Sequence, residues 1–159
     1  MEIGEQIEVD ISAIAHGGHC VARHDGQVIF VRHAIPGERV LVEITGKSKN
    51  FARANCVKVV KASPHRVSPP CKYAHADGCG GCDFQHIEIS AQLELKRSVI
   101  REQFSRLGRI EIDLDVLPVE PTNGLHWRTR MDFAISKNGK PGLYSARSKE
   151  VTEIDKCLI

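Results

Sequence analysis

The sequence predicts a mixed fold, with a small all-β barrel at residues 1–61 and a small α+β domain with an antiparallel sheet at residues 62–159. Three observations support this prediction. Short β-branched stretches alternate with turn-forming pairs in the first part, which is typical of compact barrels. A proline-rich stretch ends this pattern. A cysteine cluster, one helical repeat and a segment of strand-like alternation follow it.

The first part contains four apolar stretches, most of which alternate with the period of two residues that is typical of strands. They lie at residues 7–11, 28–31, 40–44 and 57–60. Glycine-containing pairs separate them, among them Asp25-Gly26 and Pro36-Gly37, and such pairs favour turns. The regular spacing of stretches and turns predicts a barrel of four or five strands.

Residues 62–70 contain Pro64, Pro69 and Pro70. Proline fixes φ and donates no backbone hydrogen bond, so this stretch is predicted to be an extended connector. We therefore place the domain boundary near Lys61.

Apolar side chains recur at helical spacing after the cysteine cluster, at Ile89, Leu93, Ile100, Phe104 and Leu107. Ser90 near the start and Gly108 after the end predict one amphipathic helix.

The stretch 127–136 alternates apolar and polar residues, and Asn138-Gly139 favours a hairpin turn. With two more short strands, around residues 143–144 and 151–154, it predicts an antiparallel meander.

Charge and composition leave the class of partner open. The formal net charge is +2, but binding to nucleic acid depends on where charge lies rather than on its sum. No apolar run approaches the roughly 20 residues needed to cross a bilayer, and acidic residues rather than a signal peptide follow Met1. We therefore expect a cytoplasmic protein with no membrane partner. In that reducing compartment, six cysteines favour metal binding over disulfides.

Cys71, Cys79 and Cys82 have a C-x7-C-x2-C spacing, with Gly80 and Gly81 between the last two. Two thiolates three positions apart can reach one centre if the backbone curls around it, and glycines remove the Cβ atoms that would oppose this. The pattern therefore indicates a metal site.

Cys157 follows the last predicted strand and can supply the fourth thiolate. Four thiolates serve either a structural zinc or an iron-sulfur cluster, and the residues alone leave both open. Cys20 and Cys56 lie in or beside predicted strands without partners at ligand spacing, so we interpret them as small buried hydrophobes.

Several motifs accompany the cysteines, namely Ser63-Pro64-His65-Arg66-Val67, Gln85-His86, Gln92-Leu93 and Lys96. With them, the segment resembles the iron-sulfur segment of the RNA uracil-5-methyltransferase family. The first part is similar to a TRAM domain, a small OB-like barrel attached to RNA-modifying enzymes. Its matching motifs are His16-Gly17-Gly18, Val21-Ala22-Arg23 and the stretches 26–31 and 34–38. The combination resembles in particular the subfamily that methylates large-subunit ribosomal RNA.

By this resemblance Cys71, Cys79, Cys82 and Cys157 would bind a [4Fe-4S] cluster, with zinc as the alternative. The family's first two ligands are commonly closer in sequence, which implies an enlarged loop at residues 72–78. The family's S-adenosylmethionine loop, catalytic cysteine and general base lie in a Rossmann-like domain without a counterpart in these 159 residues. We therefore expect a fragment or truncated form that is inactive alone.

An enzyme that modifies a base in structured RNA must extrude that base, and contacts with flanking nucleotides help to offset the cost. The barrel candidates for contacts with structured ribosomal RNA are Arg23, Arg32, His33, Lys47, Lys49, Phe51 and Arg53. The stretch 127–130 resembles the family's aromatic-Arg-x-Arg strand, which adds Arg128 and Arg130. Each has an alternative interpretation as a solvated charge or, for Phe51, as a core side chain.

The first hypothesis is that the chain is the RNA-recognition part of an S-adenosylmethionine-dependent RNA uracil-C5 methyltransferase. The second is a free-standing RNA-binding protein that carries a structural cluster or zinc and has no catalytic activity. A third is a redox-responsive regulator, which no feature of the sequence requires.

Overall fold

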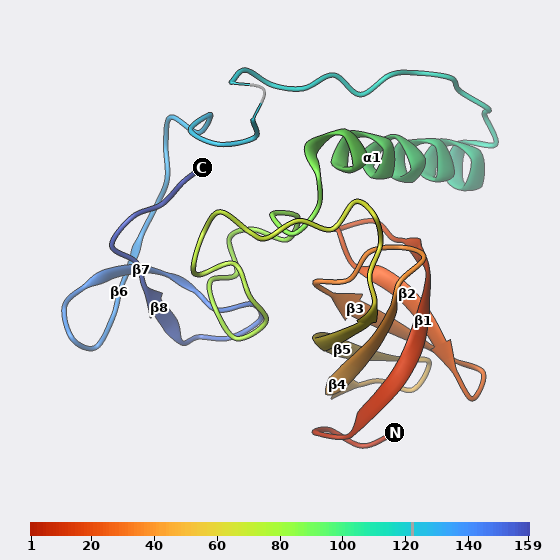
Figure 1. Cartoon of the computed structure of the whole chain (residues 1–159), viewed down its shortest axis with the longest axis horizontal. Coiled ribbons are helices and arrows are strands. Elements are labelled where there is room, and N and C mark those ends of the chain that lie inside the picture. Colours follow the sequence, from red (N-terminus) through yellow and green to blue (C-terminus); the bar gives the residue numbers. More distant parts are fainter. Residues whose placement is uncertain (122) are drawn as a thin grey trace.

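The computed structural model describes residues 1–121 and 123–159. A five-stranded barrel is followed by a connector, a helix that lies across one end of the barrel, and a small sheet (Figure 1). The barrel strands are β1 (Gln6–Ile14), β2 (Cys20–His24), β3 (Gln27–Arg32), β4 (Arg39–Lys47) and β5 (Phe51–Lys61). The later elements are α1 (Ile89–Gln103), a π-helical turn η1 (Phe104–Gly108), β6 (Ala134–Ile135), β7 (Pro141–Tyr144) and β8 (Val151–Glu153).

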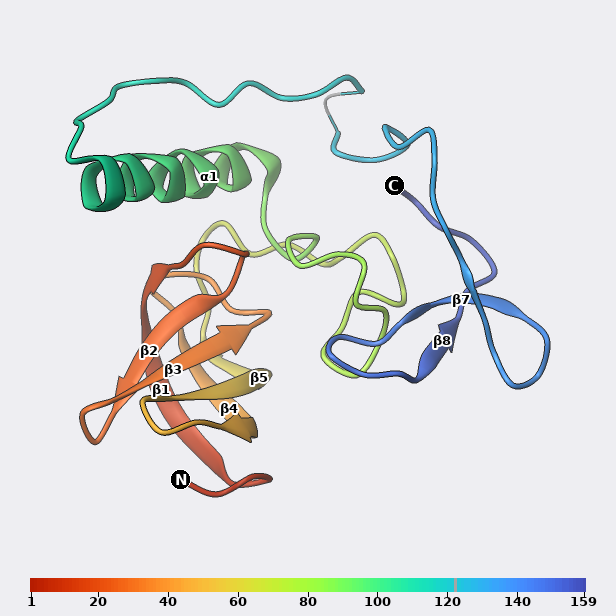
Figure 2. The same ribbon diagram turned by 180° about the vertical axis from the view of Figure 1, so that it is seen from behind.

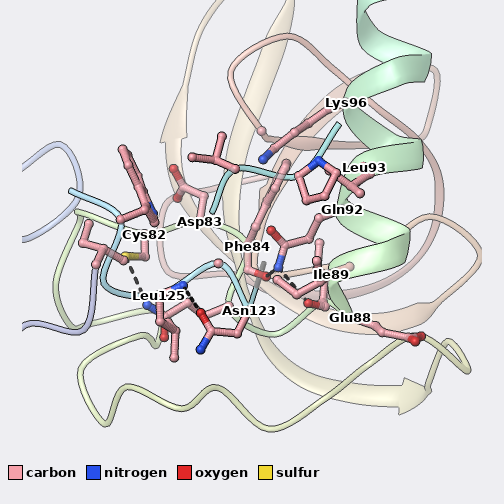
Figure 3. A pocket seen from close by; sticks show the side chains of 18 of the residues that line it. Cys82, Asp83, Phe84, Glu88, Ile89, Gln92, Leu93, Lys96, Asn123 and Leu125 are labelled. Atoms are coloured by element: carbon pink, nitrogen blue, oxygen red, sulfur yellow. Dashed lines mark hydrogen bonds between the residues drawn. The ribbon is translucent and has the colours of Figure 1, made fainter. Parts of the chain in front are cut away.

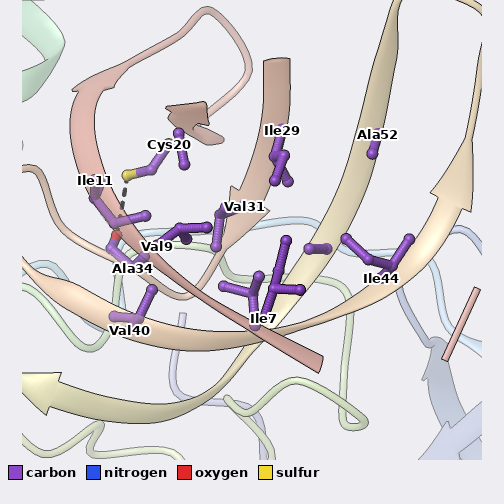
Figure 4. Close-up of a cluster of buried hydrophobic side chains, with 13 residues drawn as sticks. Ile7, Val9, Ile11, Cys20, Ile29, Val31, Ala34, Val40, Ile44 and Ala52 are labelled. Atoms are coloured by element: carbon purple, nitrogen blue, oxygen red, sulfur yellow. Dashed lines mark hydrogen bonds between the residues drawn. The ribbon is translucent and has the colours of Figure 1, made fainter. Parts of the chain in front are cut away.

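The barrel closes in the order β1-β2-β3-β5-β4, with β3 and β5 parallel and the other pairs antiparallel. Alternate residues point inward, so that Ile29, Val31 and Val40 are completely buried while their neighbours are not (Figure 4). Because alternation of this kind buries one face of every strand, the predicted barrel is confirmed. The structure has five barrel strands, and β2 is the strand that lies outside the four apolar stretches of the sequence.

α1 occupies the predicted residues, but its apolar side chains are not covered as those of the barrel are. No residue of α1 is buried among those described, and the side chains of Phe104 and Leu107 in the following turn are 46% and 71% exposed. The helix passes one end of the barrel without being enclosed by it (Figure 2). Within the described part of the chain, no helix has the length and apolar character that a membrane span requires.

The predicted strand at residues 127–136 is wrong for most of its length. Only Ala134 and Ile135 pair with β7, and β8 pairs with the other edge of β7. The chain before Ala134 leaves the sheet, and the backbone N–H of His126 donates to the carbonyl of Leu158 over 2.8 Å. Alternation predicts a strand only where a neighbouring strand supplies hydrogen-bond partners, and this segment lacks one. The β6-β7-β8 meander itself is confirmed.

A buried ion pair fixes the connector against the barrel. The carboxylate of Glu38, which is 1% exposed, accepts two hydrogen bonds of 2.6 Å from the guanidinium of Arg66. It also accepts the backbone N–H groups of Ile35 and Ser63. Burial alone would raise the pKa of Glu38, but these hydrogen bonds and the charge of Arg66 outweigh it and lower the pKa below 4.5.

A second contact joins the barrel to the residue after Cys82. Arg32, which is 8% exposed, donates to the carboxylate of Asp83 over 2.7 Å. The imidazole of His86 lies 3.2 Å from the carbonyl oxygen of Ala34. The end of the cysteine-bearing segment is therefore held against the barrel by the side chains of Arg32, Asp83 and His86.

Replacing Arg66 by Met should lower the free energy of unfolding by about 3–5 kcal/mol, because Glu38 would keep a buried charge without its partner. Urea denaturation at pH 7 measures this. The matched control is Arg39→Met. Arg39 makes a similar pair with Asp10, at 2.9 and 2.7 Å, but both side chains are exposed, so we expect little change. Equal losses from the two variants would contradict a special role for the buried pair.

The penalty of Arg66→Met should also depend on pH. The pKa of Glu38 is lowered in the folded state, so its ion pair contributes stability above the ordinary pKa of 4.5. That contribution is lost as the pH falls through the lowered folded-state value. The difference between the wild type and Arg66→Met should therefore shrink below about pH 4.5 in the same denaturation experiment.

Candidate functional site

Four cysteines line one small cavity beside the β6-β7-β8 sheet. They are Cys71, Cys79, Cys82 and Cys157. Cys71 ends the connector, Cys79 and Cys82 flank the glycine pair, and Cys157 follows β8. The structure thus brings together the four residues that the sequence singled out, from three separate segments of the chain.

The glycine pair allows the cysteine loop to pack directly on β7. The N–H of Gly80 donates to the carbonyl of Tyr144 over 2.9 Å, and Cys79 forms a bridge with Ser145. A Cβ atom at Gly80 would lie 2.8 Å from both the Tyr144 oxygen and the Ala146 nitrogen, so a side chain does not fit there. A Cβ at Gly81 would lie 3.3 Å from the sulfur of Cys79. The glycines therefore provide a close-fitting backbone cradle for the sulfurs.

The loop at residues 72–78, which follows Cys71, contacts the segment that carries Cys157. The ammonium of Lys72 and the hydroxyl of Tyr73 both donate to the carboxylate of Asp155, over 2.8 and 2.7 Å. The hydrogen bonds from Lys72 and then Tyr73 lower the pKa of Asp155 to about 2. Because Asp155 lies two residues before Cys157, these contacts place the last cysteine near the first.

Two of the four sulfur atoms, those of Cys79 and Cys82, accept hydrogen bonds. Gln85 accepts the N–H of Cys71 over 3.1 Å and donates to the sulfur of Cys82 over 3.2 Å, and the N–H of Gly81 donates to the sulfur of Cys79 over 3.3 Å. Burial raises the pKa of the Cys79 and Cys82 thiols. A bound cation favours the deprotonated thiolate, and the backbone and amide donors stabilise it. The types of these residues thus suit thiolate ligation.

The four sulfurs share a cavity but do not converge on one point. Among the described residues, no three His, Cys, Asp or Glu side chains lie close enough together to hold a single metal ion. The two other cysteines stand apart. Cys20 lies in the barrel core, where its thiol donates to the carbonyl of Ala34, and the half-buried Cys56 packs against that core.

The outer face of β2, β3 and β5 carries an aromatic and basic surface. Phe30 of β3 pairs in register with Arg53 of β5, and Val28 pairs with Phe51. The two phenyl rings meet edge to face, with centroids 5.4 Å apart. The guanidinium of Arg53 lies 5.1 Å from the Phe51 ring centroid and 5.9 Å from that of Phe30. We call Phe30, Phe51 and Arg53 the aromatic platform.

Four other barrel candidates lie in different settings. Arg23 is exposed and pairs in register with Val28, on the strand next to the platform. Arg32 is buried in its ion pair with Asp83. Lys47 is ion-paired with Glu2 over 2.9 Å, and Lys49 is exposed in the turn between β4 and β5. The candidates therefore do not form one continuous surface.

His33 lies between the barrel and the connector. Its backbone has a φ of +61°, and its Nε2 is buried without a hydrogen-bond partner in the described part of the chain. Burial, and then the positive charge of Arg32, lower the pKa of His33 to about 4. His33 is therefore neutral near pH 7.

The two later candidates precede the small sheet. The guanidinium of Arg128 lies 5.2 Å from the ring centroid of Trp127, and Arg130 is exposed. Both belong to the extended segment before β6 rather than to a strand.

The structure adds two residues to the basic surface that sequence reasoning missed. Arg147, in the loop between β7 and β8, has a guanidinium nitrogen 3.1 Å from the Nε2 of His19, which precedes β2. Burial lowers the pKa of Arg147, as do the positive charges of Arg53 and Arg32. These two residues are 128 positions apart, and no local pattern connects them.

A groove of about 860 Å³ separates α1 from the extended segment that follows it (Figure 3). Apolar side chains dominate its lining, including Phe84, Ile89, Leu93 and Leu117, and Cys82 lies at its edge. The apolar positions at the start of α1 therefore face this groove.

Comparison with known proteins places these features in context. Residues 1–57 match the family model described as TRAM domain. The chain is 45% identical to an uncharacterized RNA methyltransferase of Streptomyces avermitilis, over 99% of this chain and 39% of the relative. It is 35% identical to a 23S rRNA (uracil(1939)-C(5))-methyltransferase of Shewanella halifaxensis, over 99% of this chain and 36% of the relative.

Among solved structures, the crystal structure of a Pyrococcus abyssi tRNA (uracil-54, C5)-methyltransferase in complex with S-adenosyl-L-homocysteine matches 94% of this chain and 32% of that chain. The TM-score is 0.61 and the sequence identity is 25%. The chain spans less than two fifths of the length of these relatives. By these matches residues 1–57 resemble TRAM domains, and almost the whole chain is similar to part of proteins named as RNA methyltransferases.

Proposed function

We propose that the chain is the RNA-recognition and iron-sulfur part of an S-adenosylmethionine-dependent RNA uracil-C5 methyltransferase. One observation carries this proposal. Four cysteines from three separate segments line one cavity, in a chain whose relatives are named as RNA methyltransferases. We assign the methyl transfer itself to a part of the enzyme outside these 159 residues, which contain no G-x-G-x-x-G motif after a strand.

The resemblance of the cysteine segment to the iron-sulfur segment of the RNA uracil-5-methyltransferase family favours a [4Fe-4S] cluster over zinc. Four thiolates serve either centre, and in a four-iron cluster each thiolate binds a different iron. Bound in the cysteine cavity, the cluster would cross-link the connector, the glycine loop and the segment after β8.

The barrel face supports the RNA part of the proposal. OB-like folds bind unpaired nucleotides through aromatic side chains and nearby cations, and the aromatic platform combines both. Extruding a base from structured RNA costs a few kcal/mol, and contacts with its neighbours help to offset that cost. The Shewanella relative is named for 23S rRNA, which makes large-subunit ribosomal RNA the proposed substrate.

The alternative is a free-standing RNA-binding protein without catalytic activity. One experiment distinguishes the two functions. The complete gene product is incubated with ribosomal RNA and with S-adenosylmethionine that is labelled in its methyl group. Label at C5 of a uracil supports the methyltransferase. RNA binding without any transfer of label favours the alternative.

Protein purified without oxygen should be brown and contain about four irons and four acid-labile sulfides per chain. The double variant Cys79→Ser, Cys82→Ser should lose both, because it removes two of the proposed ligands. The control Cys56→Ser changes a thiol outside the cavity and should retain them. Metal analysis, sulfide determination and visible absorption measure the outcome. One tightly bound zinc and no sulfide in the wild type would overturn the cluster.

Gly80→Ala tests the cradle without removing a ligand. The new Cβ would collide with the backbone of Tyr144 and Ala146, at 2.8 Å, and should destabilise the protein by about 1–3 kcal/mol and lower its iron content. Gly46→Ala is the matched control, since its Cβ would meet nothing closer than 3.9 Å and its φ is not positive. Urea denaturation measures the stability of each variant, and iron analysis measures its iron content. Unchanged iron content and stability in Gly80→Ala would contradict the close packing of the loop on β7.

A further inference from the structure

We propose that Arg53, Arg147 and His19 form a seat for one phosphodiester of single-stranded RNA, with the adjoining base stacked on the rings of Phe30 and Phe51. This inference rests on the proposed RNA-binding function and adds a specific site to it. The seat joins the barrel to the β7-β8 hairpin, so neither part forms it alone.

The barrel supplies the first half of the seat. His19 precedes β2, while Phe30 and Arg53 are paired neighbours on β3 and β5. Ile29, Val31, Ala52 and Ala54 point into the core, so the alternating residues of these strands face outward. The positions of Arg53 and the two rings are therefore set by the barrel itself rather than by a flexible loop.

The hairpin supplies the second half. Arg147 lies in the loop between β7 and β8 and reaches the imidazole of His19 over 3.1 Å. This loop is anchored at its base, because the N–H of Ser145 donates to the carbonyl of Glu150 and that of Gly80 donates to Tyr144. The hairpin thus holds a second guanidinium beside His19, close enough for the charge of Arg53 to lower the pKa of Arg147.

The charges around the seat are not balanced within the described residues. Asp83 is the carboxylate that acts on both Arg147 and His19, and it is already bound by Arg32 at 2.7 Å. Neither Arg53 nor Arg147 has a carboxylate within 4.0 Å in the described part of the chain. Burial lowers the pKa of both Arg147 and His19, and neighbouring arginines lower them further. An anion between these groups would relieve the repulsion.

The chemistry of the seat matches a nucleotide rather than a free anion. Two guanidinium groups present forked N–H donors suited to phosphate oxygens, and a half-buried aromatic platform lies next to them. Stacking on such a platform requires a base that is not already stacked in a duplex. Single-stranded RNA supplies the phosphate and the free base at neighbouring positions.

The test measures the affinity of the intact chain for a labelled oligouridylate by fluorescence anisotropy. The oligonucleotide has about 12 nucleotides, a length that one OB-like fold can cover. Arg53→Gln and Arg147→Gln should each weaken binding about tenfold. Each should also reduce the slope of log affinity against log salt by about 0.7, which corresponds to one lost phosphate contact on a single strand. Arg147→Lys should retain the slope, because the charge remains, while affinity falls because the fork is lost.

Lys137→Gln is the matched control. It removes the same charge from the exposed β6-β7 turn, at the other end of β7 from Arg147, and should leave both affinity and slope unchanged. Circular dichroism melting establishes that every variant is folded. Binding by the wild type with unchanged affinity and slope in Arg53→Gln and Arg147→Gln would overturn the seat and leave RNA recognition intact. Equal affinity for a blunt RNA duplex would overturn the single-strand assignment. Failure of the wild type to bind would overturn both proposals.

Discussion

The buried carboxylate of Glu38 holds the connector against the barrel, and the positions of the later elements depend on it. Removing this charge from water is costly, and four hydrogen bonds offset that cost, two from Arg66 and two from backbone amides. The same guanidinium also donates to the carbonyl of His33, so it fixes the loop that follows β3. The three prolines of the connector donate no backbone hydrogen bonds, and the side chain of Arg66 supplies two of the four bonds that Glu38 accepts.

The cysteine cavity and the basic surface are parts of one continuous structure. Asp83, which binds Arg32 of the barrel, directly follows Cys82. On the other side, Cys79 and Gly80 pair with Tyr144 and Ser145, just before Arg147. A centre that orders the cysteine loop would therefore also order the hairpin that carries Arg147. If the proposed cluster and RNA contacts are both present, a structural cross-link would affect the RNA contacts of Arg147 without any change of redox state.

α1 differs from the barrel in how it is stabilised. A helix of 15 residues is marginal alone, and helices usually gain their stability from packing an apolar face. Here Ile89 and Leu93 line the groove, while Arg97 binds Asp113 over 2.7 Å and so fastens the following segment to the helix. The exposed side chains of Phe104 and Leu107 have no comparable cover in the described structure. The sequence therefore has more apolar residues at helical spacing than the described structure covers.

The sequence by itself determined the elements whose signals are local. Alternation and turn pairs predicted the barrel, helical spacing predicted α1, and cysteine spacing with Gly80-Gly81 identified the four residues that line the cavity. Only the tertiary structure decided which elements meet. Residues 127–133 alternate like a strand but lack a partner, because pairing depends on the path of another segment. Arg32 binds Asp83, and Arg147 meets His19 across 128 positions, since contacts between distant side chains leave no periodic trace in a single sequence.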